Sequence, residues 1–291
     1  MQRLRHGAFH FHALLKVPGC MENPANCLSA AASDKPEYMV ESAWIEHAPF
    51  AFWVVETHRP KLLVELGTHH GYSYFSFCQQ VRRMGFPARC FAVDTWQGDA
   101  HAGFYGEDVF EGVRRHNDLH YADFSTLIRS TFAEAASGFV DGSIDLLHID
   151  GRHYYDDVRD DFEAWRAKLS RRAIVLFHDT QVRERGFGVH RFWDEIRQGC
   201  PHFEFEHCYG LGVLGAGSDP GLANFPLFKA AEDAQSARAI QEAYARLGAV
   251  VHSQVSAELK RRRRQLRWER RRAAVRRFVP RWLWRDGRHG G

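Results

Sequence analysis

The segment Val64-Glu65-Leu66-Gly67-Thr68-His69-His70-Gly71 joins a short apolar run to a loop bounded by two glycines. Three further apolar runs end in a similar way, at Asp94, at Asp150-Gly151-Arg152-His153 and at His178-Asp179. Short apolar runs are typical of parallel strands buried on both faces, and open α/β sheets bind ligands at the carboxyl ends of their strands. The four ends therefore predict one ligand-binding crevice.

The order of elements along the chain predicts an α/β fold with a doubly wound, mostly parallel, seven-stranded sheet. Strand and helix alternate up to about residue 198, which is the pattern of a βαβ series. We expect strands over residues 61–66, 89–93, 126–130, 143–149 and 173–177, and a closing hairpin over 203–207 and 210–214. We expect helices over residues 37–58, 72–84, 155–169 and 188–197.

The chain divides into three regions. Residues 1–36 lack clear periodicity and are predicted to be a poorly ordered leader, residues 37–226 form the body, and residues 227–291 form a helical basic extension with one loop near Gly248. The long segment from Asp94 to Asp118 is rich in Gly, Trp, His and Tyr, which favours a lid over the crevice. A packing insertion without ligand contact is the alternative.

Charge is distributed unevenly along the 291 residues. Residues 260–291 carry 14 Lys and Arg against two acids, whereas the other 259 residues carry 25 Lys and Arg against 34 acids. An acidic body disfavours nucleic-acid binding there, and any polyanion contact belongs to the basic extension. None of the six cysteines forms a Cys-x-x-Cys pair, which excludes zinc-ribbon and thioredoxin sites and indicates a reducing, cytoplasmic compartment.

The first loop is suited to a ligand that the backbone approaches closely. Gly67 and Gly71 allow that approach, and the helix that follows offers amides to a carboxylate. The loop is not a P-loop, and His69 interrupts the Gly-x-Gly-x-x-Gly dinucleotide pattern. At the end of the second strand, Asp94 is placed to accept hydrogen bonds from a ribose. A plain βα turn and a capping acid are the alternatives for the loop and for Asp94.

Two acids and two histidines end the later strands. Asp150 and Asp179 should lie side by side, and two like charges at close range are costly unless a divalent cation lies between them or one acid is protonated. We favour the cation, and capping of the sheet end is the alternative. His178 could add a nitrogen ligand or simply pack, and His153 is near enough to remove a proton from a hydroxyl. His148 lies within its strand and is interpreted as a core histidine.

These residues resemble a class I S-adenosylmethionine-dependent methyltransferase over about residues 37–215. Glu65-x-Gly67-x-x-x-Gly71 is similar to the degenerate first motif of that family, and Asp94 to its ribose acid. The segment Trp96-Gln97-Gly98-Asp99 to Tyr105-Gly106, with Ile144 to His153 and Phe177-His178-Asp179-Thr180, resembles a bacterial branch. That branch includes macrocin-type O-methyltransferases and cephalosporin-hydroxylase-like proteins.

The resemblance implies roles for individual residues. In metal-dependent members, residues at the positions of Asp150, His178 and Asp179 hold magnesium, and a His at the position of His153 is the base. This chain departs from the family at His178, where an acid is typical, so a softer divalent cation is the alternative to Mg²⁺. The residues expected to bind S-adenosylmethionine are Glu65, Gly67, Thr68, Gly71, Tyr72, Ser73, Asp94, Thr95, Ser130 and Asp150, with Ser130 near the adenine.

The sequence therefore predicts methyl transfer from S-adenosylmethionine to a hydroxyl of a sugar, glycan or glycosylated small molecule, assisted by a divalent cation. One alternative is a nicotinamide-dependent oxidoreductase. The other is a non-catalytic binding module that docks through its basic extension.

The basic extension opens with Lys260-Arg261-Arg262-Arg263-Arg264 and interleaves apolar residues with cations. A solvated helix, an anionic membrane surface and RNA all fit this composition. A solvated or disordered extension is the first interpretation, a peripheral contact with the inner membrane surface is the second and nucleic acid is the third, and an assembly of identical chains is left open. The interleaved apolar residues are Leu266, Trp268, Val275, Phe278, Val279, Trp282, Leu283 and Trp284.

Overall fold

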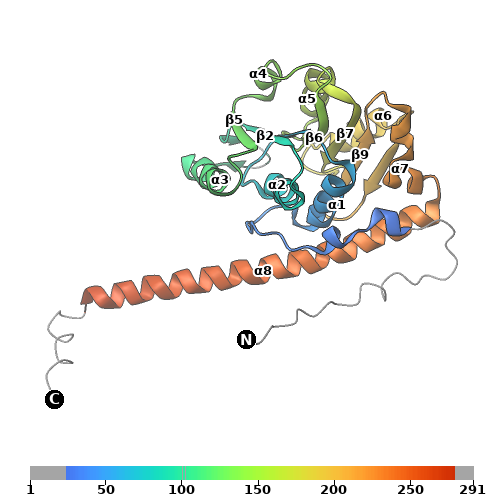
Figure 1. The fold of residues 1–291 in the computed structure, drawn as a ribbon. Coiled ribbons are helices and arrows are strands. Elements are labelled where there is room, and N and C mark those ends of the chain that lie inside the picture. The colour runs from blue at the N-terminus through green and yellow to red at the C-terminus, as the bar shows by residue number, and fades with distance from the viewer. Residues whose placement is uncertain (1–23, 100, 102, 279–291) are drawn as a thin grey trace.

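A computed structural model describes residues 24–99, 101 and 103–278 (Figure 1). Its main sheet has seven strands in the order β5-β2-β1-β6-β7-β9-β8. The first five strands in this order pair in parallel, whereas β9 runs antiparallel to both β7 and β8. The prediction of a doubly wound, mostly parallel seven-stranded sheet is confirmed. The strands are β1 (Leu62–Leu66), β2 (Arg89–Asp94), β5 (Ser125–Arg129), β6 (Ile144–Ile149), β7 (Leu169–His178), β8 (His202–Phe205) and β9 (Leu211–Gly215).

Helices cover both faces of the sheet. The helices are α1 (Ala48–His58), α2 (Tyr72–Met84), α3 (Glu107–His120), α4 (Phe132–Ala136), α5 (Tyr155–Arg166), α6 (Val189–Ile196), α7 (Pro226–Ala231) and α8 (Ala234–Phe278). One buried cluster includes residues of α1, α2, α7 and α8, and a second includes residues of α4, α5 and α6. Both faces of the sheet are therefore shielded from water, as parallel sheets require.

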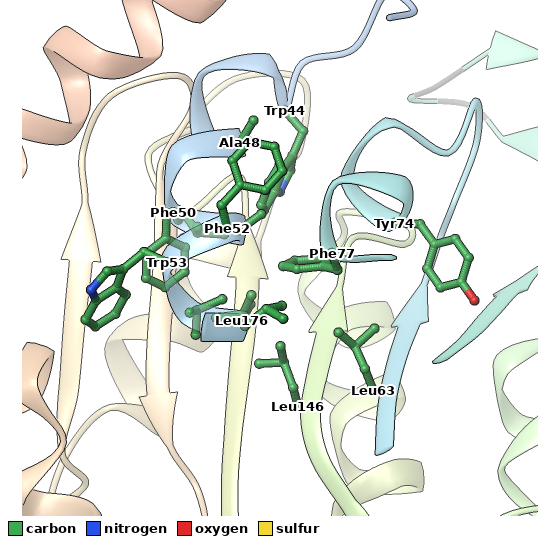
Figure 2. Close-up of a cluster of buried hydrophobic side chains, with 14 of the residues drawn as sticks. Trp44, Ala48, Phe50, Phe52, Trp53, Leu63, Tyr74, Phe77, Leu146 and Leu176 are labelled. Carbon is green, nitrogen blue, oxygen red and sulfur yellow. The ribbon is translucent and has the colours of Figure 1, made fainter. Parts of the chain in front are cut away.

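Successive side chains of each strand alternate between the two faces of the sheet, and both faces are buried. This explains why the strands are unbroken apolar runs in the sequence. Leu63, Leu146 and Leu176 belong to the first cluster and lie under the aromatic side chains of α1 and α2 (Figure 2). Their neighbours Val64 and Leu147 belong to the second cluster. Successive side chains point to opposite faces, so both positions must be apolar.

Several sequence-based boundaries are corrected. The strand expected over 173–177 begins at Leu169, and the helix expected to reach residue 169 ends at Arg166. The helix expected over 37–58 begins only at Ala48, because Pro49 fits the first turn of a helix and a short 3-10 helix, Ile45–His47, precedes it. The lid expected from Asp94 to Asp118 contains a two-stranded hairpin, β3 (Gly98–Asp99) with β4 (Gly103–Phe104), and then α3. Two acids in the first turn of α3, Glu107 and Asp108, favour a helix start there.

The N-terminal segment differs from the predicted leader wherever it is described. Residues 24–36 form two 3-10 helices, Pro24–Cys27 and Ala30–Ser33, and their residues Cys27 and Ala32 are buried. The hydroxyl of Tyr244 in α8 donates to the carbonyl of Cys27 at 2.8 Å. This segment is therefore part of the packed body, and residues 1–23 lie outside the described part of the chain.

The C-terminal extension is helical as predicted, but the loop expected near Gly248 is wrong. Helix α8 runs unbroken through Gly248, and a Cβ atom there would lie 2.5 Å from the carbonyl oxygen of Glu46. Glycine at this position therefore permits close contact between α8 and the 3-10 helix before α1 rather than breaking the helix. Ile240, Tyr244 and Val255 are buried against the body, whereas residues 260–272 are exposed.

Within the described residues, no helix is both long enough and apolar enough to cross a membrane.

Gly248→Ala should lower the free energy of unfolding by about 1–3 kcal/mol, because the added methyl group clashes with backbone. Gly112→Ala is the matched control, since Gly112 is also helical but has open space around its Cβ position. The control should stabilise the protein by about 0.5–1 kcal/mol through helix propensity. Chemical denaturation measures both effects, and equal stabilisation by the two substitutions would contradict the packing.

Candidate active site

The carboxyl ends of β2, β1, β6 and β7 lie together at one edge of the sheet. The parallel register aligns Leu66 with Val93 and with Ile149, and Ile149 with Phe177. A cleft of about 1260 Å³ opens at this edge, which is large enough for a nucleoside-sized ligand and a second molecule. Most of the predicted site residues line it: Gly67, Thr68, Gly71, Tyr72, Ser73, Asp94, Thr95, Asp150, His153, His178 and Asp179.

Asp94 organises the first loop. Its Oδ2 accepts the backbone N–H groups of Thr68 and His69, each at 2.8 Å, and its Oδ1 accepts the N–H of Trp96 at 2.7 Å. A carboxylate has about four acceptor sites, so one on Oδ1 remains for a ligand hydroxyl. The predicted ribose role of Asp94 is compatible with this geometry, and Asp94 has a second role in holding the loop.

The first loop also touches the end of β6. Gly67 adopts φ +85°, and a Cβ atom there would lie 2.1 Å from the carbonyl oxygen of Asp150. The N–H of Asp150 in turn donates to the carbonyl of Leu66 at 2.9 Å. No side chain fits between these segments, so Gly67 is required both for its backbone conformation and for the close approach.

Glu65 lies behind the cleft wall in a buried hydrogen-bonded chain. Trp44 Nε1–H donates to His148 Nε2 at 3.1 Å, which leaves the proton of the neutral ring on Nδ1. His148 Nδ1 then donates to Glu65 Oε2 at 2.8 Å. Burial raises the pKa of Glu65, and the bond from His148 opposes that rise. The prediction of His148 as a core histidine is confirmed.

The acids and histidines of β6 and β7 form a compact cluster. His153 Nε2 lies 2.9 Å from Asp179 Oδ2 and 3.7 Å from Asp150 Oδ1. His178 Nδ1 lies 3.2 Å from Asp150 Oδ1 and 3.4 Å from Asp179 Oδ2. The two carboxylates are therefore side by side, as the sequence predicted, and both imidazoles face them.

Charge pairing inside this cluster outweighs the cost of burial. Burial alone would lower the pKa of His153, but its bonds to Asp150 and Asp179 raise that pKa to about 9. Burial likewise opposes ionisation of Asp179, yet the two imidazoles lower its pKa to about 2. The pKa of His178 is raised well above its usual value by the same two carboxylates, against burial. At neutral pH the metal-free cluster therefore pairs two carboxylates with two imidazolium rings.

The donor atoms of Asp150, His153 and Asp179 all lie within 4.8 Å of one another, close enough to hold one metal ion. Two carboxylate oxygens and one imidazole nitrogen suit a divalent cation, so the residues fit the group that the sequence predicts. The histidine in this group of possible ligands is His153. The sequence analysis instead assigned His178 to the metal and proton removal to His153. The assignment of His178 as a ligand stays a prediction.

Two predicted site residues do not line the cleft. The side chain of Glu65 is fully buried, and the hydroxyl of Ser130 donates to Glu134 at 3.2 Å. The next three residues, Thr131, Phe132 and Ala133, line the cleft instead. The end of β5 therefore does reach the site, one residue later than expected.

Sequence reasoning missed two neighbours of His153. His101, from the β3–β4 hairpin, places Nδ1 3.3 Å from His153 Nδ1, and Phe187 stacks on the His153 ring at 4.4 Å. His101 Nε2 also lies 3.1 Å from the carbonyl oxygen of Arg185, on the loop after β7. The hairpin thus reaches over the cleft to the His153 side, and the aromatic composition of residues 96–106 was its only sequence signal.

Comparison with known proteins agrees with the fold. Residues 64–180 match the profile of a family described as a methyltransferase domain. The uncharacterized protein y4gI of Sinorhizobium fredii is 51% identical over 194 residues, covering 67% of this chain and 21% of that protein. This chain thus corresponds to about a fifth of the length of that relative.

Solved structures resemble the chain at low sequence identity. The SAH-bound Podospora anserina methyltransferase PaMTH1 is 13% identical, with a TM-score of 0.46 over 64% of this chain and 92% of that chain. A methyltransferase from Geobacter sulfurreducens is 17% identical, with a TM-score of 0.45 over 60% of this chain and 79% of that chain.

Residues 64–180 therefore match a methyltransferase domain, and the strand order confirms the predicted Rossmann-like fold. The prediction of a methyltransferase agrees with this match. The macrocin-type branch stays a prediction.

Asp94→Asn should lower the free energy of unfolding by about 1.5–3 kcal/mol, because an amide nitrogen would face a backbone N–H donor. Amide hydrogen exchange at Thr68, His69 and Trp96 should accelerate. Asp123→Asn, at an exposed position outside the cleft, is the control and should change neither measurement. Unchanged exchange in Asp94→Asn would show that Asp94 does not hold the loop.

In metal-free protein, the His153 ring should stay protonated until the pH approaches about 9. Because this folded-state pKa exceeds the unfolded value, its contribution to stability is complete below about pH 6.5 and is lost as the pH rises through 9. NMR titration of the imidazole nitrogens measures the pKa. Asp179→Asn should move it back toward 6.5, and an unchanged pKa in that variant would contradict the pairing.

Proposed function

We propose that this protein transfers a methyl group from S-adenosylmethionine to a hydroxyl oxygen of a sugar, glycan or glycosylated small molecule. The observation that carries the proposal is the meeting of two parts in one cleft. The loop held by Asp94 lies on one side, and the cluster of Asp150, His153 and Asp179 lies on the other. The loop suits a nucleoside with an amino-acid group, and the cluster suits an acceptor hydroxyl.

The residues of the first loop fit the donor. Thr68 lines the cleft, and its Oγ1 is buried without a hydrogen-bond partner in the described part of the chain, so it could accept from an ammonium group or an ordered water. Asp94 keeps an acceptor site for a ribose hydroxyl. When bound, S-adenosylmethionine supplies a methyl group already activated by a sulfonium. The protein then mainly aligns donor and acceptor.

A divalent cation, with Mg²⁺ as the first candidate, fits Asp150 and Asp179, and it would lower the pKa of an acceptor hydroxyl. In metal-free protein His153 already holds a proton at neutral pH, so it cannot accept a second one. A divalent cation held by Asp150 and Asp179, with His153 outside its ligands, would offset the charge that retains this proton. His153 would then be able to take the proton of the acceptor hydroxyl.

The lining of the cleft supports a sugar-like acceptor. It includes the aromatic residues Tyr105, Phe187 and Tyr209 and the polar residues Gln181 and Arg183. A sugar offers apolar C–H faces to rings and hydroxyls to polar side chains, so this mixture suits it. A nicotinamide cofactor fits less well, because the first loop lacks the middle glycine that approaches a pyrophosphate.

The test is methyl transfer from labelled S-adenosylmethionine to sugars and glycan extracts, with and without Mg²⁺. His153→Gln should lower kcat by about 10²–10⁴-fold, as expected for loss of a proton acceptor. Asp150→Asn and Asp179→Asn should abolish the dependence on Mg²⁺ together with most activity. Asp123→Asn is the control and should retain full activity.

Binding of S-adenosylhomocysteine by calorimetry separates the two parts of the proposal. Binding retained in His153→Gln, with transfer lost, would support the division between donor loop and cluster. Full turnover in Asp179→Asn with chelator present would exclude the cation, and preference for NAD over S-adenosylhomocysteine would exclude methyl transfer.

A further inference from the structure

The C-terminal part of α8 projects away from the body and is strongly basic (Figure 1). Residues 260–272 include nine Lys and Arg and one acid, Glu269. These residues are exposed, and the helix continues to Phe278. Residues 260–272 belong to neither the main sheet nor the lining of the cleft.

The nine cations of residues 260–272 fall into three groups. Arg261 and Arg262 pair with Glu258, and Arg263 pairs with Glu41. Arg272 lies over the ring of Trp268, 4.3 Å from the ring centroid. The remaining five have no ion pair within the described residues. We call them the basic stripe, and they are Lys260, Arg264, Arg267, Arg270 and Arg271.

Helical geometry gathers the basic stripe on one side. At 3.6 residues per turn its five members lie within an arc of about 120° and span about 16 Å of helix. Gln265, Leu266 and Glu269 lie on the other side of the helix. Like charges three and four residues apart destabilise a helix, so an extended anionic partner would stabilise this one.

The basic stripe begins at the rim of the cleft. Glu41 lines the cleft and also pairs with Arg263, one turn before Arg267. Arg262 Nη1 donates to the carbonyl of Met39 at 3.3 Å, which fixes the same turn of α8 to the body. A partner bound along the stripe therefore lies near the entrance of the cleft.

We propose that the basic stripe docks this protein on the surface of an anionic phospholipid bilayer. A flat bilayer can contact the projecting helix while the acidic body stays away from the headgroups. The side chain of Trp268 is 55% exposed beside the cations, and aromatic residues concentrate at membrane interfaces. This inference does not depend on the reaction proposed above.

Vesicle sedimentation with the full chain tests the docking. Wild-type protein should bind phosphatidylcholine vesicles containing about one third phosphatidylglycerol, should not bind pure phosphatidylcholine, and should be released by salt. The variant R264Q/R267Q/R270Q/R271Q should bind the anionic vesicles at least ~100-fold more weakly. Circular dichroism confirms that this variant keeps its helix.

The matched control replaces the same four arginines by lysine, which keeps the charge but loses the planar guanidinium. This variant should bind anionic vesicles nearly as well as wild type, because the attraction to a headgroup layer depends on the number of positive charges and not on the shape of the guanidinium group. Equal binding to neutral and anionic vesicles, or undiminished binding by the glutamine variant, would overturn the proposal. Absence of vesicle binding together with tight binding to RNA would overturn it in favour of a nucleic-acid partner.

Discussion

The parallel register of β2, β1, β6 and β7 is the constraint on which the rest of the structure depends. It brings four strand ends to one edge, although they are separated by long stretches of chain. Polar groups at these ends are stable because the strands behind them are fully buried between two helical layers. A shift of one residue in any strand would turn its apolar side chains to the wrong layer and move its terminal acid from the cleft.

The site divides its charges between two tasks. Asp94 accepts three hydrogen bonds from backbone N–H groups and so fixes the conformation of the first loop without a ligand. Asp150 and Asp179 bond to imidazoles instead, whose protons can leave. Asp94 therefore has a structural role and keeps one acceptor site for a ligand. The hydrogen bonds of Asp150 and Asp179, by contrast, depend on protons that the imidazole rings can lose. This difference agrees with the proposed division of the cleft, in which the first loop binds the methyl donor and the cluster takes a proton from the acceptor.

The sequence predicts those parts of the molecule that short-range rules govern. Helix α2 has the predicted limits because Gly71 and Gly85, both with positive φ, flank it. Gly248 looks the same in sequence but sits inside α8, and only the approach of Glu46 explains it. The chain from Trp44 through His148 to Glu65 joins residues far apart in sequence, so no local pattern reveals it. The placement of His153 among the possible metal donors likewise depends on tertiary distances.

The contact between Gly67 and Asp150 has a further consequence. Because the first loop rests directly on the backbone at the end of β6, neither segment can shift without displacing the other. A ligand that moves the first loop would therefore also move the end of β6, through the backbone contact at Gly67. Thermodynamic linkage would make any resulting change in affinity reciprocal between the two halves of the cleft.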